Sequence, residues 1–302
     1  MNADLFDEEI ELPNRQAQER LDGLVGLDDI KQRIYTNASV LLDPDALKAW
    51  SNTHHGTVLP AVDAFAKRTP LFIFAGDVGT GKTTLAESFG QQVAKARNID
   101  ISVLRLSLRS RGSGAVGEMT RLLGEAFDEV VHRGRLLKSG DALIVVIDEA
   151  DAIAQSRELG QMHHEDRAGV NALIRGIDTV AAESLPVVVV MCTNRLDSLD
   201  PAVRRRAAAE FEFHRPNQTQ REHLLCSALK GCDITNEEIQ RLASLAGGVE
   251  RGYGHTYSDL VNRVLPAAVL TAFPDRKLTS AIVTEAITNN HPTAPFQERQ
   301  GV

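Results

Sequence analysis

Four short runs of apolar residues constrain the fold of this 302-residue chain more than any other feature. Each run is the length of one strand, is rich in Val, Ile, Leu or Phe, and is apolar on both strand faces; the runs are residues 71–75, 101–106, 142–147 and 186–192. The stretches between them carry apolar residues at helical spacing; they are residues 82–97, 116–138 and 167–180. Doubly buried strands that alternate with helices predict an α/β fold, a parallel sheet with helices on both faces.

The chain changes character after Pro216. Thr235 followed by Glu238 has the pattern of a capping box, and residues 258–273 and 280–289 continue with helical spacing. This part predicts a small, all-helical domain. The expected division is a flexible acidic N-terminal segment over residues 1–20, a large α/β domain over 21–215, a small helical domain over 216–290 and a polar tail over 291–302.

A glycine-rich motif follows the first apolar run and opens a helix. Its sequence fits GxxxxGK[ST] at every fixed position, in the strand-to-helix context that a phosphate loop requires. Glycines let backbone N–H groups converge on a phosphate, while Lys82 is expected to reach the β- and γ-phosphates and Thr83 to bind Mg²⁺. The alternative is a glycine-rich turn that merely contains a lysine. The predicted nucleotide-binding residues here are Gly76, Asp77, Val78, Gly79, Thr80, Gly81, Lys82, Thr83 and Thr84.

Polar side chains end the last two apolar runs. Asp148 and Glu149 follow residues 142–147, and the carboxyl ends of parallel strands face the ligand crevice of an open sheet. Asp148 is therefore expected to hold Mg²⁺ and Glu149 to orient and polarise an attacking water. Capping of the next helix is the alternative for such a pair, and Asp151 fits that role better. Asn194 is expected to contact the γ-phosphate or the water, unless it only forms a strand-end turn.

Three consecutive arginines, residues 204–206, follow the last of these runs. One use for them is an arginine finger that enters the site of a neighbouring subunit and makes hydrolysis depend on oligomerisation. The alternatives are a basic surface patch or salt-bridge cluster, and contact with DNA. Because the chain carries a net charge of −8, DNA contact is the less favoured of these.

The sequence also bears on whether the chain is a membrane protein, a secreted protein or a disulfide-bonded protein. No apolar run approaches the ~20 residues that a membrane helix needs, and the acidic N-terminal sequence does not resemble a signal peptide. The three cysteines are odd in number and lack metal-type spacing. They predict reduced, buried thiols in a cytoplasmic protein.

The chain resembles an AAA+ ATPase over residues 21–290. The resemblance rests on the order of its motifs: the phosphate loop, then the Asp-Glu pair, then Thr-Asn, then the arginines, all before a helical domain. The resemblance implies that Val25 and Gly26 lie in the segment lining the adenine pocket. It also implies that Asn194 is the sensor 1 residue, that Arg205 and Arg206 occupy finger positions, and that ATP and Mg²⁺ are the cofactors. The helical domain is then the family's lid. No clear sensor 2 arginine is present, and Arg263 is the nearest substitute.

Two segments occupy the places of the family's pore loops. Residues 111–119 lie where the first loop belongs, and Ala115-Val116-Gly117 replaces the usual aromatic, apolar, glycine pattern. Val116 and Met119 would then contact a polypeptide through apolar side chains in place of an aromatic one. Residues 161–167 would be the second pore-facing loop, which contains His163 and His164. A metal site at these histidines is not expected, because the HExxH spacing is absent.

The two loop sequences look most like the pachytene-checkpoint type of AAA+ ATPase, in the bacterial branch found beside a cyclic-oligonucleotide synthase. The resemblance implies a hexamer that remodels a HORMA-domain protein and separates it from that nucleotidyltransferase in antiphage defence. Two other functions stay open: an AAA+ protein that acts on DNA-associated complexes, such as a loader or transposition regulator, and a nucleotide-gated scaffold without hydrolysis. Neither a membrane nor nucleic acid is the expected partner.

Overall fold

The computed structural model describes residues 5–66, 68–107, 118–152, 164–248 and 252–295. Backbone contacts divide the chain into two compact units. The sheet unit comprises Met1–Asp22, Asp29–Ala75 and Thr83–Glu212, and the helical unit comprises Gly23–Asp28, Gly76–Lys82 and Phe213–Val302. The phosphate-loop motif therefore groups with the C-terminal helices, although it directly follows a strand of the sheet.

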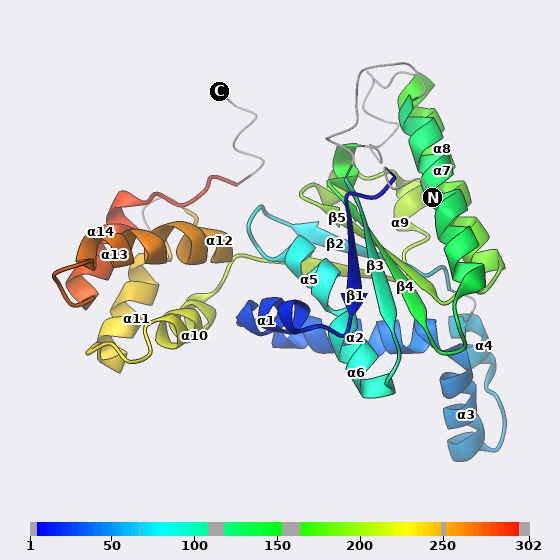
Figure 1. Ribbon diagram of the computed structural model, residues 1–302, viewed down its shortest axis with the longest axis horizontal. Coiled ribbons are helices and arrows are strands. Elements are labelled where there is room, and N and C mark those ends of the chain that lie inside the picture. The colour runs from blue at the N-terminus through cyan, green and yellow to red at the C-terminus, as the bar shows by residue number, and fades with distance from the viewer. Residues whose placement is uncertain (1–4, 67, 108–117, 153–163, 249–251, 296–302) are drawn as a thin grey trace. The chain divides into compact units, whose positions relative to one another are not determined.

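The sheet unit is built on six strands in the order β1-β3-β4-β5-β2-β6 (Figure 1). Strands β3, β4, β5 and β2 pair in parallel, and β1 adds to the edge in antiparallel register with β3. The predicted α/β sheet is thus confirmed, with one antiparallel strand added. The strands are β1 (Glu8–Leu12), β2 (Leu71–Gly76), β3 (Ile101–Ser107), β4 (Ala142–Asp148), β5 (Val187–Thr193) and β6 (Ala209–Phe213).

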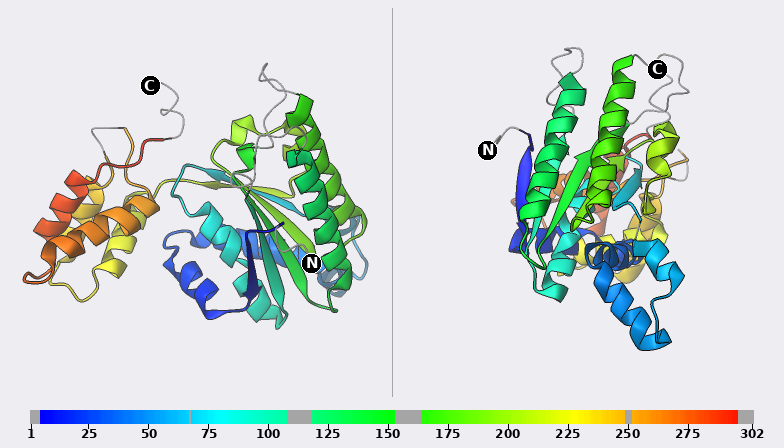
Figure 2. Two further views of the ribbon diagram at one scale, coloured as in Figure 1. Left: turned by 45° about the horizontal axis from the view of Figure 1, so that its top comes forward. Right: turned by 90° about the vertical axis from the view of Figure 1, so that its right-hand side faces the viewer.

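Helices cover both faces of this sheet (Figure 2). One face packs against α7 and α8 in a core that includes Leu123, Phe127 and Leu173. On the other face, Phe72 and Phe74 meet the ring of Phe211 edge-on at 5.5 Å. The helical elements of this unit are α1 (Arg15–Gly23), α2 (Asp28–Leu42), α3 (Pro44–His55), α4 (Pro60–Ala66), α5 (Lys82–Ser88), α6 (Gly90–Arg97), α7 (Glu118–Leu136), η1 (Ala150–Ala152), α8 (His164–Ala182), η2 (Leu196–Ser198) and α9 (Pro201–Arg204).

Helices α7 and α8 approach each other closely at Gly176. A Cβ added there would lie 2.2 Å from Cγ of Phe127, whereas a Cβ added at Gly124 of α7 would meet no atom within 4 Å. We expect Gly176→Ala to lower the free energy of unfolding by about 1–3 kcal/mol, because the buried ring must move. Gly124→Ala is the matched control and should raise it by about 0.5–1 kcal/mol through helix propensity. Chemical denaturation of both variants checks this pair, and equal effects of the two substitutions would contradict the close packing.

The sequence predicted a flexible segment over residues 1–20, but the part of it that the structure describes contains regular secondary structure. Residues 8–12 form β1, and α1 begins at Arg15. The acidic side chains of β1 have partners: Glu9 lies 2.7 Å from Arg133, Glu8 lies 3.6 Å from Arg105, and Glu11 accepts a hydrogen bond from Ser102. The acidity of this strand therefore reflects pairing with basic and polar residues of the sheet unit rather than disorder.

The helical unit contains α10 (Gln218–Ala228), α11 (Asn236–Leu245), α12 (Tyr257–Asp259), a π-helical turn η4 (Leu260–Val264), α13 (Leu265–Ala272) and α14 (Ser280–Asn289). The predicted capping box at Thr235 and Glu238 is confirmed, and Thr256 and Asp259 form another at α12. The C-terminal segment was expected to be a polar tail from residue 291. Its described part instead binds α12, because Thr293 donates through both its N–H (3.0 Å) and its hydroxyl (2.6 Å) to Asp259.

Asp259 makes the stability of this unit dependent on pH. Burial alone would raise the pKa of this carboxyl, but hydrogen bonds from Thr293 and Thr256 outweigh it and lower the pKa from 3.8 to about 2. A carboxyl group whose pKa is lower in the folded state than in the unfolded state stabilises the fold at pH values above its unfolded-state pKa. This stabilisation is lost as the pH falls through the folded-state pKa. We therefore expect Asp259→Asn to cost about 2 kcal/mol at pH 7, and the difference from wild type to shrink between about pH 5 and pH 2.

Denaturant unfolding of both proteins across this pH range measures the difference. Asp233→Asn is the control, since Asp233 forms a surface pair with Lys277 in which both side chains are more than four-fifths exposed (88% and 85%). A difference between wild type and Asp259→Asn that stays constant with pH would contradict the assignment.

Within the described residues, no helix is long and apolar enough to cross a membrane. The three cysteines are free thiols, as predicted. Cys192 is buried and Cys232 half-buried, but Cys226 is exposed, so the expectation of burial is wrong for that residue.

Candidate active site

The phosphate loop connects β2 to α5 and closes around its lysine. Gly76, Gly79 and Gly81 all have positive φ (151°, 76° and 95°), a backbone region that favours glycine. The ammonium of Lys82, only 7% exposed, donates to the carbonyl oxygens of Gly76 (3.0 Å) and Asp77 (2.8 Å). The loop therefore has the folded form that a phosphate cradle needs, with the lysine already held against its backbone.

Thr83 and Asp148 lie together in the sheet unit, as the sequence predicted for a shared metal site. The Thr83 hydroxyl is 3.2 and 3.3 Å from the two carboxylate oxygens of Asp148. Hydroxyl and carboxylate oxygens are the ligands that Mg²⁺ prefers. The donor set and its spacing thus fit a magnesium ion.

Glu149 follows Asp148 in an unusual backbone conformation. Its φ is +54°, in the left-handed region, and its N–H donates to Asp148 Oδ1 at 2.9 Å. This conformation is costly for a residue with a side chain, and such strain clusters at functional sites. The sharp turn after β4 lets two adjacent acids serve one site, since they need not alternate across the sheet as in a regular strand.

An arginine on the neighbouring strand β3 approaches the Asp148 carboxylate. Arg105 lies 3.7 Å from Asp148 and 3.2 Å from Glu87, which also pairs with Arg20 at 3.1 Å. Burial raises the pKa of Glu87, while the charges of Arg105 and Arg20 act in the opposite direction. This cluster was not predictable from the sequence, because its members come from four separate elements.

The carboxyl ends of β4 and β5 are adjacent, since the two strands pair in parallel with Ile147 opposite Met191. Asn194 therefore follows the strand next to the Asp-Glu pair, as expected. The preceding Thr193 donates from its hydroxyl to Asp151 at 3.3 Å. Asp151 thus links the two strand ends, which is a different contact from the helix cap that the sequence suggested.

The three arginines at the end of α9 and directly after it differ in their surroundings. Arg204 binds Glu210 through two nitrogens (3.1 and 2.9 Å), and Arg206 binds Asp178 in the same way (2.9 and 3.1 Å). Arg205 is exposed, and no described residue pairs with it. The salt-bridge alternative therefore holds for two members of the triplet, and Arg205 is the one whose guanidinium stays available to another molecule.

The helical unit brings Gly26 beside Tyr257. The Gly26 carbonyl accepts a hydrogen bond from Gln220 at 2.6 Å, and a Cβ added at Gly26 would lie 3.1 Å from the Tyr257 hydroxyl. Burial, followed by the charge of Asp28, raises the pKa of Tyr257 to about 12. Its hydroxyl thus stays protonated beside the expected adenine segment. Tyr257 was not among the predicted site residues, so its contact with Gly26 is new.

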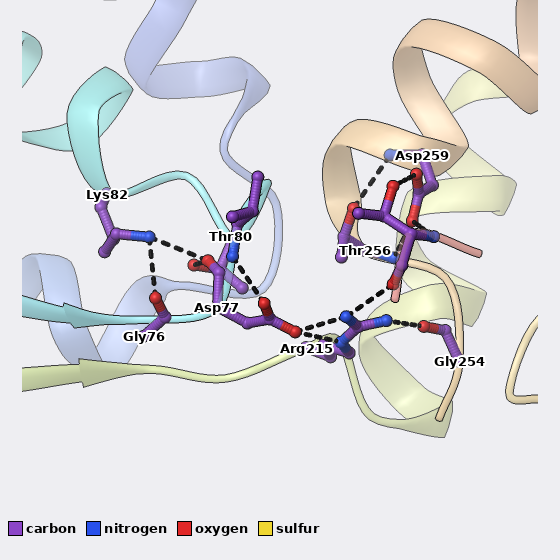
Figure 3. A network of polar contacts seen from close by, with 10 residues as sticks. Gly76, Asp77, Thr80, Lys82, Arg215, Gly254, Thr256 and Asp259 are labelled. Atoms are coloured by element: carbon purple, nitrogen blue, oxygen red, sulfur yellow. Dashed lines mark hydrogen bonds and ion pairs between the residues drawn. The ribbon is translucent and has the colours of Figure 1, made fainter. Parts of the chain in front are cut away.

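Arg215 joins the phosphate loop to other parts of the helical unit (Figure 3). Its guanidinium binds the Asp77 carboxylate and also donates to the carbonyl oxygens of Gly254 (2.6 Å) and Thr293 (2.8 Å). The sequence did not predict this contact, since Asp77 and Arg215 are 138 positions apart. The only available signal was Asp77 itself, a carboxylate inside an anion-binding motif.

The expected pore-loop residues are only partly described. Ala115, Val116, Gly117 and His163 lie outside the described residues, and His164 is the first residue of α8. Met119 is described, and its partly buried side chain packs against the core of the sheet unit. Because the side chain is only partly buried, contact of Met119 with a substrate stays a prediction.

Comparison with known proteins agrees with this arrangement. Residues 72–215 match the model of the ATPase family associated with various cellular activities (AAA). The chain is 45% identical to CD-NTase-associated protein 6 of Escherichia coli (strain MS 115-1), over 98% of this chain and 97% of that protein.

Two solved structures are similar over almost the whole chain. One is the HORMA:CdnC:Trip13 complex of E. coli MS115-1, with TM-score 0.90 and 45% identity over 96% of this chain and 97% of the other. Another is Trip13 of Rhizobiales, with TM-score 0.77 and 41% identity over 96% of this chain and all of the other (100%). The chain therefore belongs to the AAA family of ATPases, as an ATP hydrolase of the group that contains CD-NTase-associated protein 6 and these two Trip13 proteins.

Proposed function

We propose that this chain binds ATP with Mg²⁺, hydrolyses it in a ring of six copies, and thereby remodels a HORMA-domain protein bound to a nucleotidyltransferase in antiphage signalling. The observation that carries this proposal is the similarity to Trip13 of E. coli MS115-1, whose structure was solved in a complex with HORMA and CdnC. Identity of 45% over 96% of the chain supports the same class of partner here.

Nucleotide binding would fall to the loop over residues 76–81 and to α5. Backbone N–H groups of the loop would bind phosphate oxygens, and Lys82 would exchange its bonds to loop carbonyls for bonds to the β- and γ-phosphates. Val25 and Gly26 would line the base, beside the protonated hydroxyl of Tyr257.

Thr83 and Asp148 would hold the magnesium ion, which supplies positive charge to the phosphate oxygens when it is bound. Glu149 would accept a proton from the attacking water, and its turned backbone lets its carboxylate act beside that of Asp148. Asn194, at the end of the adjacent strand, would orient the water or the γ-phosphate by hydrogen bonding.

Arg205 would complete the hydrolytic site of the neighbouring copy. Its exposure and the intrachain partners of Arg204 and Arg206 support this choice among the three. A guanidinium at the γ-phosphate stabilises the charge of the transition state. Residues 216–290 would act as the lid domain of each copy.

The partner protein would meet the two expected pore loops, and the predicted substrate contacts there are Ala115, Val116, Gly117, Met119, His163 and His164. The small or apolar side chains of the first loop suit contact with a polypeptide without an aromatic residue. An acidic chain also suits a protein partner better than nucleic acid, since its net charge is −8.

Action on DNA-associated complexes is the second hypothesis. It rested on the arginine triplet, and two of those arginines are neutralised by Glu210 and Asp178. DNA binding that weakens steeply with salt and stimulates ATP turnover would favour it over protein remodelling.

Native mass spectrometry tests the assembly and the partner together. We expect the Glu149→Gln variant, mixed with ATP and a purified HORMA protein of the same operon, to give a ring of six copies with the HORMA protein bound. Monomers only, or a ring that does not retain the HORMA protein, would contradict the proposal.

A further inference from the structure

The phosphate loop carries a negative charge of its own. Asp77 is the second residue of the loop, and its Oδ1 accepts a hydrogen bond from the N–H of Val78 at 2.8 Å. A carboxylate at this place opposes the binding of a triphosphate, because two like charges within a few ångströms repel each other strongly. Nucleotide binding therefore requires a cation that cancels this charge.

Arg215 supplies that cation in the same compact unit. Its Nε and Nη2 both bind Asp77 Oδ2, the first at 2.7 Å. The two side chains are only 15% and 18% exposed, so water and salt screen the pair weakly. The pair thus leaves the loop close to neutral before any nucleotide arrives.

The remaining donors of Arg215 reach two other segments. Nη1 donates to the Gly254 carbonyl, and Nη2 also donates to the Thr293 carbonyl, while the Tyr253 ring lies 5.1 Å from the guanidinium carbon. A single planar group therefore ties the loop to residues 253–254, just before α12, and to the C-terminal segment 291–295. Lysine cannot reproduce this, because it is a point charge without a rigid fork of donors.

A second contact ties the loop to α12 directly. The Gly79 carbonyl accepts a hydrogen bond from the Ser258 N–H at 3.1 Å. A Cβ added at Gly79 would lie 2.7 Å from the Thr256 hydroxyl, so only glycine permits this approach. The loop is thus in direct contact with the start of α12.

Arg263, the nearest substitute for a sensor 2 arginine, has other partners. It donates to Asp259 at 3.1 Å and to the His291 carbonyl at 3.2 Å. These bonds hold it on α12 and the C-terminal segment. Among the described contacts, the phosphate loop reaches the C-terminal segment through Arg215, whereas it reaches residues 253–259 both through Arg215 and through the Gly79 carbonyl.

We propose that Arg215 is a positioning residue that cancels the charge of Asp77 and fastens the phosphate loop to residues 253–259 and 291–295, so that a nucleotide in the loop sets the conformation of those segments. The inference rests on the proposed function only in that the loop binds a nucleotide. It goes further by assigning the coupling to a residue outside every motif of the sequence.

The charge part of this proposal is tested by ADP affinity in a double-mutant cycle. We expect Arg215→Gln to weaken ADP binding about tenfold, more at low salt than at high salt, because Asp77 is left uncompensated. Asp77→Asn combined with Arg215→Gln should recover most of that loss. Arg221→Gln is the matched control: Arg221 donates to the carbonyls of Ala243 (2.7 Å) and Pro216 (2.5 Å) in the same unit without touching the loop, and its loss should change affinity less than about twofold. A double variant as weak as Arg215→Gln would overturn the charge argument.

The coupling part is tested by hydrogen exchange of the full chain with and without ADP. In the wild type we expect ADP to slow exchange in residues 253–259 and 291–295. Arg215→Lys keeps the charge, so it should bind ADP within about threefold of wild type, but ADP should no longer slow exchange in residues 291–295, which reach the loop through the guanidinium group. Slowing of residues 291–295 in Arg215→Lys equal to that in the wild type would overturn the proposal.

Failure of the proposed function is a separate outcome. A wild type that binds no nucleotide would refute nucleotide binding at the loop. The contact between the loop and the C-terminal segment can still be tested without ligand. We expect residues 291–295 to exchange faster in Arg215→Gln than in either the wild type or Arg221→Gln. Equal exchange in that segment would refute the fastening.

Discussion

Replacement of Glu149 by Gln is expected to reduce ATP turnover at least about 100-fold while ATP binding stays within a few-fold of wild type. The change removes the carboxylate that we propose accepts a proton from water, and it keeps the size of the side chain. Binding should persist because the phosphate loop, Thr83 and Asp148 are untouched. Steady-state phosphate release and equilibrium binding of a fluorescent ATP analogue measure the two quantities separately.

Glu125→Gln is the matched control for this substitution. Glu125 lies on the exposed side of α7 and pairs with Arg121 four residues earlier at 2.6 Å, an arrangement worth only tenths of a kcal/mol. Its turnover should equal that of wild type. Turnover of Glu149→Gln within about threefold of wild type would show that another group activates the water.

Replacement of Arg205 by Ala is expected to lower turnover about 10³-fold, the lower part of the range for a missing arginine finger. Because Arg205 is exposed and has no described partner, its removal should leave the fold of its own subunit unchanged. The expected defect thus appears only in the assembled ring, as a loss of turnover without loss of ATP binding.

Mixing two inactive variants tests whether Arg205 acts on a neighbour. A subunit with Arg205→Ala keeps its own Glu149, and a subunit with Glu149→Gln keeps its own Arg205. Random mixing at equal amounts should rebuild about a quarter of the sites and recover about that share of wild-type turnover, since each site takes one group from each of two subunits.

Arg204→Ala is the comparison variant. It breaks the two-bonded pair with Glu210, so any loss of turnover should come with a lower unfolding midpoint and should not be recovered by mixing with Glu149→Gln. Mixed rings of Arg205→Ala and Glu149→Gln that remain as inactive as either parent would contradict a site shared between subunits.

The fold was largely predictable because the parallel strands consist almost entirely of apolar residues. Every residue of β5 is buried, as are the first six of β4, and such runs stand out from the helices between them. The edge strand β1 was missed for the opposite reason. Its sequence Glu-Glu-Ile-Glu-Leu has the composition of a solvated segment, and its partners Arg105 and Arg133 become visible only in the fold.

The residues of the candidate site also differ in how far the sequence predicts them. Thr83 and Asp148 were predictable because each belongs to a motif with fixed spacing, and the structure brings them within 3.3 Å. Arg205 could not be separated from its neighbours by sequence, since the difference lies in Glu210 and Asp178 beside the other two. Arg215 could not be found at all, because nothing local distinguishes it from the other basic residues of the chain.

Release of a HORMA protein from its complex with a nucleotidyltransferase is the most direct measurement of the proposed function. With purified components, wild-type chain and ATP should dissociate the complex at a rate that follows ATP turnover. ADP, or the Glu149→Gln variant with ATP, should leave the complex intact. A complex that persists while the wild type hydrolyses ATP, or that dissociates equally with Glu149→Gln, would contradict ATP-driven remodelling.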